Sequence, residues 1–198
     1  MKKLLGIVVV VLIFSFQSWT KAEDIKDLQI EGISIGDNLF DHFTQAEFDY
    51  AKDVSNIFYY KKNKFAELLF FKHSKFETFD GVKVTWKPDD KNHKLYGVSG
   101  LIYFKNNYDE CKVKREEIIK DIENFLPNIK NTGTEKINYD ENGKSYALVT
   151  DLVLKPPYEE IRVYCSNWSD EEESKGAWDA LNVVINHPEF SKFMEDPH

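Results

Sequence analysis

The sequence predicts an α+β protein in which antiparallel β-meander strands form one or two sheets with helices packed on one face. Aromatic and β-branched runs separated by polar turns recur in residues 64–106 and again in residues 134–168. A segment with the apolar period of an amphipathic helix precedes the second region, and shorter helical signals precede the first. The order of helix and then strands therefore occurs twice. It predicts two helix-on-sheet units or one larger sheet.

The first 22 residues have the pattern of a secretory signal peptide. Two lysines at the start are followed by an apolar run of 13 residues, 4–16, and by small residues at the cleavage-determining positions, 20 and 22. This run is shorter than the about 20 residues that a membrane-spanning helix needs. We expect cleavage between Ala22 and Glu23, and a periplasmic or secreted protein with no transmembrane segment in the mature chain.

The mature chain has a strongly negative charge. Cleavage removes three lysines and no acid, which leaves 23 basic and 34 acidic residues and a net charge of −11. A surface of this charge repels phosphate backbones and anionic lipids, which argues against nucleic-acid binding and against peripheral membrane binding. The two arginines, Arg115 and Arg162, are few for phosphate recognition, which favours the bidentate guanidinium group.

The mature chain divides where the apolar period changes. We expect an N-terminal unit in residues 23–108 and a C-terminal unit in residues 109–198, and the two can form one continuous domain. In the first unit, Asp37 is placed to cap a short helix, and Thr44-Gln45-Ala46-Glu47 matches a capping box that begins another. Strands follow in residues 64–73, 75–87 and 94–106.

The second unit begins with a longer helix. Asp109 can cap it, Pro127 stops it, and apolar side chains recur at helical spacing between them. Strands are expected in residues 134–140, 145–154 and 159–168, and Asn142-Gly143 predicts a tight hairpin between the first two. Residues 179–186 fit a strand or a helix, and their alternation of apolar and polar side chains favours the strand. A short helix is expected from residue 188.

Cys111 and Cys165 are the two cysteines of the chain. Cys111 lies on the apolar stripe of the predicted helix, and Cys165 shares one strand face with Ile161 and Val163, so both sulfur atoms point into one helix–sheet interface. An exported compartment oxidises such a pair, and we predict a disulfide bond. A redox-active pair and two free buried thiols are the alternatives, and the absence of a C-x-x-C motif argues against the first.

Sequence signals for catalysis, metal binding or cofactors are scarce. No catalytic residue, metal site or cofactor is predicted, because nucleophile-elbow, metalloprotease, P-loop and dinucleotide motifs are absent. The paired acids at 89–90, 116–117 and 159–160 are expected to be solvated or to face opposite ways. The acidic run 170–173 is expected to be a solvated loop or helix start. Exposed positions are expected for the scattered histidines, His42, His73, His93, His187 and His198.

Aromatic side chains are the remaining candidates for a binding surface. Trp86, Trp168, Trp178 and the run Phe58-Tyr59-Tyr60 could stack on sugars or contact a partner peptide. Core positions are the alternative for most of them.

The stretches DIKDLQIEGISIGDNLFDHF (24–43), ECKVKREEIIKDI (110–122) and IRVYCSNW (161–168) resemble a group of uncharacterised small secreted proteins of marine bacteria. The resemblance covers most of the mature chain and implies a periplasmic protein without catalytic activity. More distantly, I-x-I-G-D-x-L at residues 33–39 is similar to small periplasmic helix-plus-meander modules of the outer-membrane assembly lipoprotein class and of β-lactamase inhibitor proteins. This second resemblance implies a fold only.

These observations favour a non-enzymatic periplasmic domain that binds an envelope protein through a sheet face or its aromatic side chains. A small-ligand or glycan-binding protein is the alternative. A hydrolase whose acids converge only in the folded chain is a third, less favoured possibility.

Overall fold

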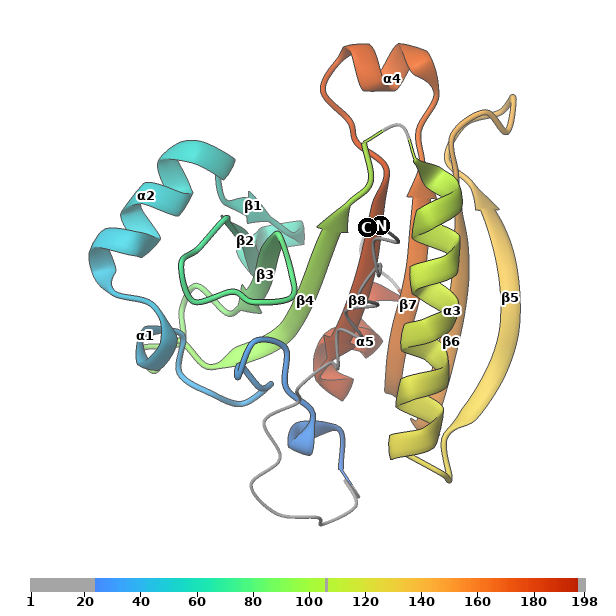
Figure 1. Ribbon diagram of the computed structural model, residues 1–198. Coiled ribbons are helices and arrows are strands. Elements are labelled where there is room, and N and C mark those ends of the chain that lie inside the picture. The colour runs from blue at the N-terminus through green and yellow to red at the C-terminus, as the bar shows by residue number, and fades with distance from the viewer. Residues whose placement is uncertain (1–23, 106, 196–198) are drawn as a thin grey trace, which may run out of the picture.

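A single antiparallel sheet organises the computed structural model, which describes residues 24–105 and 107–195 (Figure 1). The strands pair in the order β1-β2-β3-β4-β8-β7-β6-β5, and the predicted α+β class with a meander sheet is confirmed. The strands are β1 (Phe58–Tyr59), β2 (Ala66–Phe71), β3 (Gly81–Trp86), β4 (Leu95–Tyr103), β5 (Lys130–Asn138), β6 (Tyr146–Lys155), β7 (Glu159–Asn167) and β8 (Ala180–Asn186). The helices are α1 (Leu39–His42), α2 (Gln45–Ser55), α3 (Tyr108–Phe125), α4 (Asp170–Ser174) and α5 (Pro188–Met194), with 3₁₀ turns η1 (Ile25–Asp27) and η2 (Lys61–Asn63).

Two helix-and-meander halves meet at β4 and β8. The first half places α1 and α2 before β1–β4, and the second places α3 before β5–β8. β4 and β8 pair from Gly97–Asn186 to Tyr103–Ala180, so the two meanders continue as one sheet. The boundary expected between residues 108 and 109 falls in the first turn of α3. Residues 180–186 form a strand, as their alternation predicts.

Helices α1, α2 and α3 lie on one face of the sheet, which we call the helix face. The register aligns Leu68, Val84, Val98, Ile185 and Ile161 in one row across five strands, and all five are buried on this face. α2 packs on β2, and α3 packs on β7 and β8. Figure 1 shows α3 in front of the second half of the sheet. The amphipathic stripes of these helices and the apolar row therefore bury one another.

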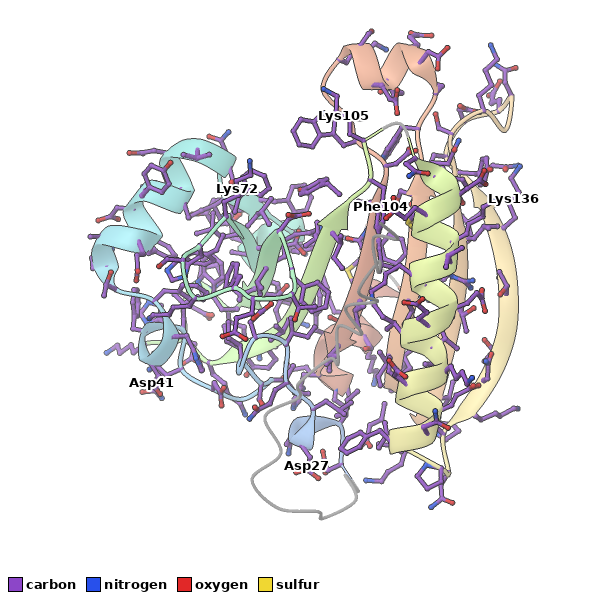
Figure 2. All side chains as sticks on the ribbon, in the orientation of Figure 1. Asp27, Asp41, Lys72, Phe104, Lys105 and Lys136 are labelled. Carbon is purple, nitrogen blue, oxygen red and sulfur yellow. A yellow bond between two sulfur atoms is a disulfide. The ribbon has the colours of Figure 1, made fainter. Side chains whose placement is uncertain are left out.

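Aromatic side chains fill the helix face near the first half. The ring of Phe43 stacks on that of Phe70 with 3.6 Å between centroids. The ring of Phe79 covers Gly100 on β4, where an added Cβ would lie 2.5 Å from the ring, so a larger residue does not fit there. Phe104, labelled in Figure 2, belongs to the same buried cluster.

Two predicted helix caps are wrong by one or two residues. Asn107 caps α3 by accepting the Glu110 N–H, whereas Asp109 lies inside the first turn and pairs with Lys112. Asn38 caps α1, whereas the neighbouring Asp37 accepts the Ser34 N–H. Asparagine and aspartate cap helices about equally well, so composition alone does not choose between them. The predicted capping box at Thr44 is confirmed.

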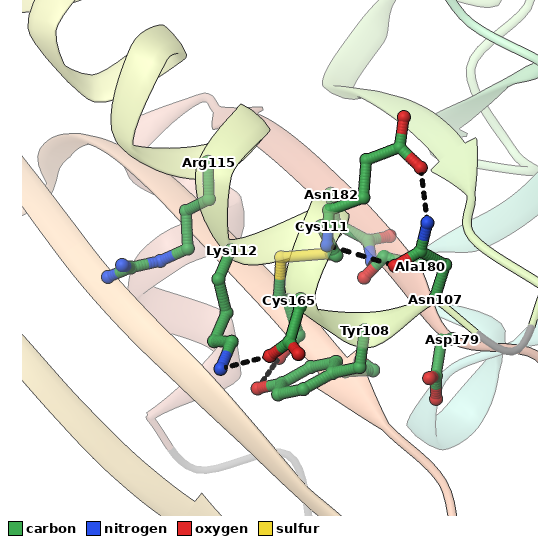
Figure 3. Close-up of a disulfide and its surroundings, with 12 residues drawn as sticks. Asn107, Tyr108, Cys111, Lys112, Arg115, Cys165, Asp179, Ala180 and Asn182 are labelled. Carbon is green, nitrogen blue, oxygen red and sulfur yellow. Dashed lines mark hydrogen bonds and ion pairs between the residues drawn. A yellow bond between two sulfur atoms is a disulfide. The ribbon is translucent and has the colours of Figure 1, made fainter.

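A disulfide bond between Cys111 and Cys165 joins α3 to β7, as predicted (Figure 3). The two Cα atoms are 6.1 Å apart, and both side chains are completely buried. The bond lies on the buried stripe of α3, which continues through Ile118, Ile119 and Ile122. The helix is therefore fixed to the sheet near its N-terminal end by a covalent bond.

Arg115, one turn further along α3, is a buried charge inside this interface. The residue is 1% exposed, and its guanidinium donates to the hydroxyl groups of Thr134 on β5 and Thr150 on β6. It also pairs with the carboxylate of Glu116. Burial lowers the pKa of Arg115, and Glu116 opposes that effect. The guanidinium thus connects α3 to the two outermost strands of the second half.

We predict that replacing both cysteines with serine lowers the free energy of unfolding by up to about 4 kcal/mol. The two residues are 54 positions apart, and the bond restricts the unfolded chain over that length. Urea denaturation measures the difference. Wild-type protein unfolded in the presence of a reductant is the control and should match the variant. A variant as stable as the oxidised wild type would contradict the prediction.

Two substitutions of Arg115 should separate the contribution of its side-chain volume to the free energy of unfolding from that of its charge. Arg115→Ala is expected to cost about 3 kcal/mol, because it leaves a cavity and removes the buried hydrogen bonds to Thr134 and Thr150. Arg115→Met keeps most of the volume and should cost less. Arg162→Met, which removes a half-exposed arginine on β7, is the control and should cost about 1 kcal/mol or less. Equal losses for all three variants in chemical denaturation would rule out a special role for Arg115.

Candidate functional site

The face of the sheet opposite to α1–α3 is the candidate functional site, and we call it the open face. The strand register places Leu69, Lys83, Ser99, Val184 and Arg162 on it in one row from β2 to β7, and Glu67 lies on the same face two residues before Leu69. Among the described elements, α5 is the helix that lies on this face. It packs at one end of the sheet, where the Phe190 ring is 4.9 Å from that of Phe65.

Aromatic rings gather at two places on the open face. In the first, the rings of Phe71, Tyr103 and Trp178 follow one another, with centroids 5.6 Å and 5.3 Å apart. In the second, just after the C-terminal ends of β5 and β7, the ring of Tyr139 stacks on that of Trp168 with 4.8 Å between centroids. Phe71 and Tyr103 stand on strands, whereas Trp178, Tyr139 and Trp168 lie one or two residues beyond strand ends. Rigid aromatic side chains of this kind are frequent in protein interfaces.

Tyr164 on β7 is a partly buried residue of the open face. Burial raises the pKa of Tyr164, and the charges of Tyr139 and of Glu67 on β2 raise it further.

Charged groups on the open face are mostly paired. The Glu67 carboxylate accepts the Tyr60 hydroxyl at 3.2 Å and lies 3.4 Å from the Lys83 ammonium. Arg162 donates to both oxygens of Asp151, at 2.7 and 3.0 Å. These pairs fix the positions of donors and acceptors before any ligand arrives. Such an arrangement suits recognition of a polar partner surface.

A pocket of about 300 Å³ opens beside the first aromatic group. Lys105, Asp170, Glu173, Ser174 and Trp178 line it, and Lys105 is labelled in Figure 2. Within the described residues, neither the lysine nor the two acids form an ion pair there, whereas the other α4 acids, at 171 and 172, bind Lys175. The volume of the pocket is at the lower end of the range found for small-molecule binding sites.

The predicted aromatic candidates lie in different environments. Trp86 is a buried core residue, Trp168 is half-buried, and Trp178 is exposed. Phe58 and Tyr59 are exposed at the edge of the sheet. Three further aromatic residues of this face, Tyr103, Tyr139 and Tyr164, are not predicted as binding residues by any sequence motif. Their signal is strand alternation, which puts them on the same face once the strand order is known.

Two histidines form carboxylate pairs instead of lying free at the surface. The Nε2 atom of His42 is 2.8 Å from an Asp37 oxygen, and that of His73 is 2.8 Å from a Glu47 oxygen. The His73 side chain is only 9% exposed, so the expected exposed position is wrong for this residue. The Phe43 ring packs against its imidazole. Within the described residues, neither imidazole hydrogen-bonds to a hydroxyl or thiol group.

The remaining predicted positions are the two cysteines and the signal-peptide cleavage site. Cys111 and Cys165 are joined, whereas Ala22 and Glu23 lie outside the described residues. Across residues 24–105 and 107–195, no group of three or more His, Cys, Asp and Glu side chains could hold a metal ion. The same part of the chain has no helix with the length and apolar character needed to cross a membrane.

Comparison of the chain with protein-family models, with curated proteins and with solved structures found no match. The resemblance to small secreted proteins of marine bacteria therefore stays a prediction.

The Glu47–His73 pair gives a prediction for the pH dependence of stability. The backbone N–H and the hydroxyl group of Thr44, and then His73, lower the pKa of Glu47 to about 2 from an ordinary value of 4.5. Because the folded-state pKa is the lower one, the ionised carboxylate stabilises the fold above pH 4.5, and this contribution is lost as the pH falls toward 2.

The Glu47→Gln variant is therefore expected to be less stable than the wild type at pH 6 and nearly as stable at pH 2, as measured by urea denaturation. Asp89→Asn, at an exposed turn, is the control for a change in net charge. A difference between Glu47→Gln and the wild type that stays constant from pH 6 to pH 2 would contradict this assignment.

Proposed function

We propose that this protein is a non-enzymatic binding domain that holds a protein partner, such as an envelope protein, on the open face of its sheet. The observation that carries the proposal is the arrangement of aromatic side chains on that face. The rings of Phe71, Tyr103 and Trp178 form one contact group, and Tyr139 and Trp168 form another. Among the described helices, α5 alone occupies this face.

The physical properties of the open face support a protein partner. Tyrosine, tryptophan and arginine are the side chains that contribute most often to binding energy in protein interfaces. Tyr103 and Arg162 stand on strands, which limits the side-chain entropy that they lose on binding. The Glu67–Lys83 and Arg162–Asp151 pairs add a polar pattern around them, which favours one partner orientation over others.

We place this function in the periplasm or outside the cell. A disulfide between buried cysteines is compatible with an oxidising compartment, where such bonds persist. The signal-peptide pattern of residues 1–22 supports the same location. A negative net charge for the mature chain also suits a partner with a basic surface.

A glycan is the second candidate ligand, favoured by the pocket beside Trp178. Its tryptophan can stack on a sugar ring, and Asp170, Glu173 and Ser174 supply hydrogen-bonding groups around it. The volume of the pocket is enough for one small ring rather than for a long oligosaccharide. A protein partner uses the whole face, whereas a glycan of this size would depend on the pocket alone.

Site-specific cross-linking tests the proposal. A photoreactive amino acid at Lys83, on the open face, is expected to capture a defined partner in cells. The same group at Val113, which is exposed on α3, should not capture it. The captured protein is then identified, purified and titrated against the mature chain by calorimetry.

The variant Trp178→Ala should weaken this binding at least about 30-fold, as expected for an interface hot spot. Tyr50→Ala, which removes an exposed aromatic ring on α2, is the matched control and should change affinity less than about threefold. Equal capture from Val113, or unchanged affinity of Trp178→Ala, would overturn the proposal. Binding of an oligosaccharide that Trp178→Ala abolishes, without any captured protein, would favour the glycan instead.

A further inference from the structure

The outer edge of the first half exposes a concentration of apolar side chains. Four of the nine exposed large apolar side chains among the described residues lie within ten positions: Tyr50 (68% exposed), Val54 (55%), Phe58 (59%) and Tyr59 (50%). Tyr50 and Val54 are one turn apart on α2, and β1 follows four residues later. Exposed apolar groups clustered in this way mark interaction sites more often than scattered ones do.

The edge presents an aromatic ring on each side of the sheet. β1 is the terminal strand and pairs with β2 through Phe58–Glu67 and Tyr59–Ala66. Glu67 lies on the open face and Ala66 on the helix face, so Phe58 projects from the first and Tyr59 from the second. The edge of the sheet therefore carries one aromatic ring on each of its two faces.

A cluster of lysines follows this edge directly. Residues 54–66 contain Lys61, Lys62 and Lys64 and no acid, although the whole chain has 34 acidic residues. All three lysines are exposed, and none forms an ion pair with another described residue. They occupy the turn between β1 and β2, where Lys62 and Asn63 have positive φ angles of 55° and 54°. The nearest acids in the sequence on the α2 side are Asp49 and Asp53, each of which is exposed.

We propose that this edge patch, formed by Tyr50, Val54, Phe58, Tyr59, Lys61, Lys62 and Lys64, binds the surface of an anionic lipid bilayer. Aromatic side chains are favoured at the level of lipid headgroups, where the ring is buried and its polar end stays hydrated. Lysines beside them are attracted to anionic headgroups, and each one strengthens binding about fivefold. The patch combines both properties within residues 50–64.

The net charge of the mature chain does not prevent this contact. Charges more than about 8 Å from the bilayer are largely screened at physiological ionic strength, so the sign of the contacting region decides the interaction. The negative net charge argues against membrane binding only when it is averaged over the whole chain. Near an anionic bilayer, the negative parts of the surface are repelled, which disfavours orientations other than the one with this edge against the bilayer. A lipid surface is favoured over a protein because a fluid plane can accept a rim with a ring on each side, whereas a protein partner would need a groove that surrounds it.

Vesicle sedimentation tests the proposal with the mature protein. Vesicles of equal parts phosphatidylglycerol and phosphatidylcholine are expected to bind the wild type, and vesicles of phosphatidylcholine alone should bind it much more weakly. The double variant Lys61→Gln/Lys62→Gln should lower the partition constant about 20-fold, from two lysine contributions. Phe58→Ser/Tyr59→Ser should lower it on both kinds of vesicle.

The matched control is Lys91→Gln/Lys120→Gln, which removes the same charge from two exposed lysines that form no ion pair with described residues. It should leave the partition constant within about twofold of the wild type. Trp178→Ala, which is designed to weaken partner binding on the open face, should also leave vesicle binding unchanged, so the two proposals can fail separately. Thermal unfolding shows whether each variant remains folded.

Three outcomes would overturn the proposal. The first is that the wild type does not sediment with anionic vesicles. The second is that Lys91→Gln/Lys120→Gln loses as much binding as Lys61→Gln/Lys62→Gln, which would indicate general electrostatics. The third is that polyglutamate binds the wild type through Lys61 and Lys62 while vesicles do not, which would assign the patch to an acidic protein segment.

Discussion

The pairing of β4 with β8 is the interaction on which the rest of the structure depends. Each half of the chain is a four-stranded meander with an inner edge, and an unpaired edge of that length would invite association with other chains. Pairing the two inner edges removes both and joins the two meanders into one eight-stranded sheet. The register also matters, because Val98 lies opposite Ile185. A slip of one residue would turn Asn182 and Asn186 toward the helices and Val183 toward the open face.

The second half then needs additional attachment, because its outer strand has little burial. All nine residues of β5 are exposed, so the hydrophobic effect contributes little to holding it. Two interactions from one helix compensate. Cys111 fixes α3 to β7 covalently, and one turn later the Arg115 guanidinium reaches Thr134 on β5 and Thr150 on β6. One side of a single helix therefore ties together the three outermost strands of that half.

The spacing of apolar residues in the sequence predicted the features that depend on a single helix or strand. The helical stripe of α3 and the alternation of β7 each placed one sulfur atom in the same layer, which is why the Cys111–Cys165 bond could be predicted without knowing the strand order. The open face could not be assembled in this way, because Tyr103 and Tyr164 become neighbours in one surface only through the β4–β8–β7 order. The same limit applies to the His73–Glu47 pair, whose members are 26 residues apart. β1 is two residues long, too short for an alternation pattern.

The distribution of charge gives the molecule an orientation. The acids of α4 lie in the connection between β7 and β8, and three strands separate β8 from β1, which the lysines follow. That separation exceeds a Debye length at physiological ionic strength, so the basic edge and the acidic connection act as independent poles. An anionic surface attracts the first and repels the second, which would set the sheet on its β1 edge. In this orientation the open face stands beside the surface and not against it, and its aromatic side chains stay accessible to a protein partner. The uneven distribution of charge would thus allow one sheet to present an edge and a face to the two proposed ligands.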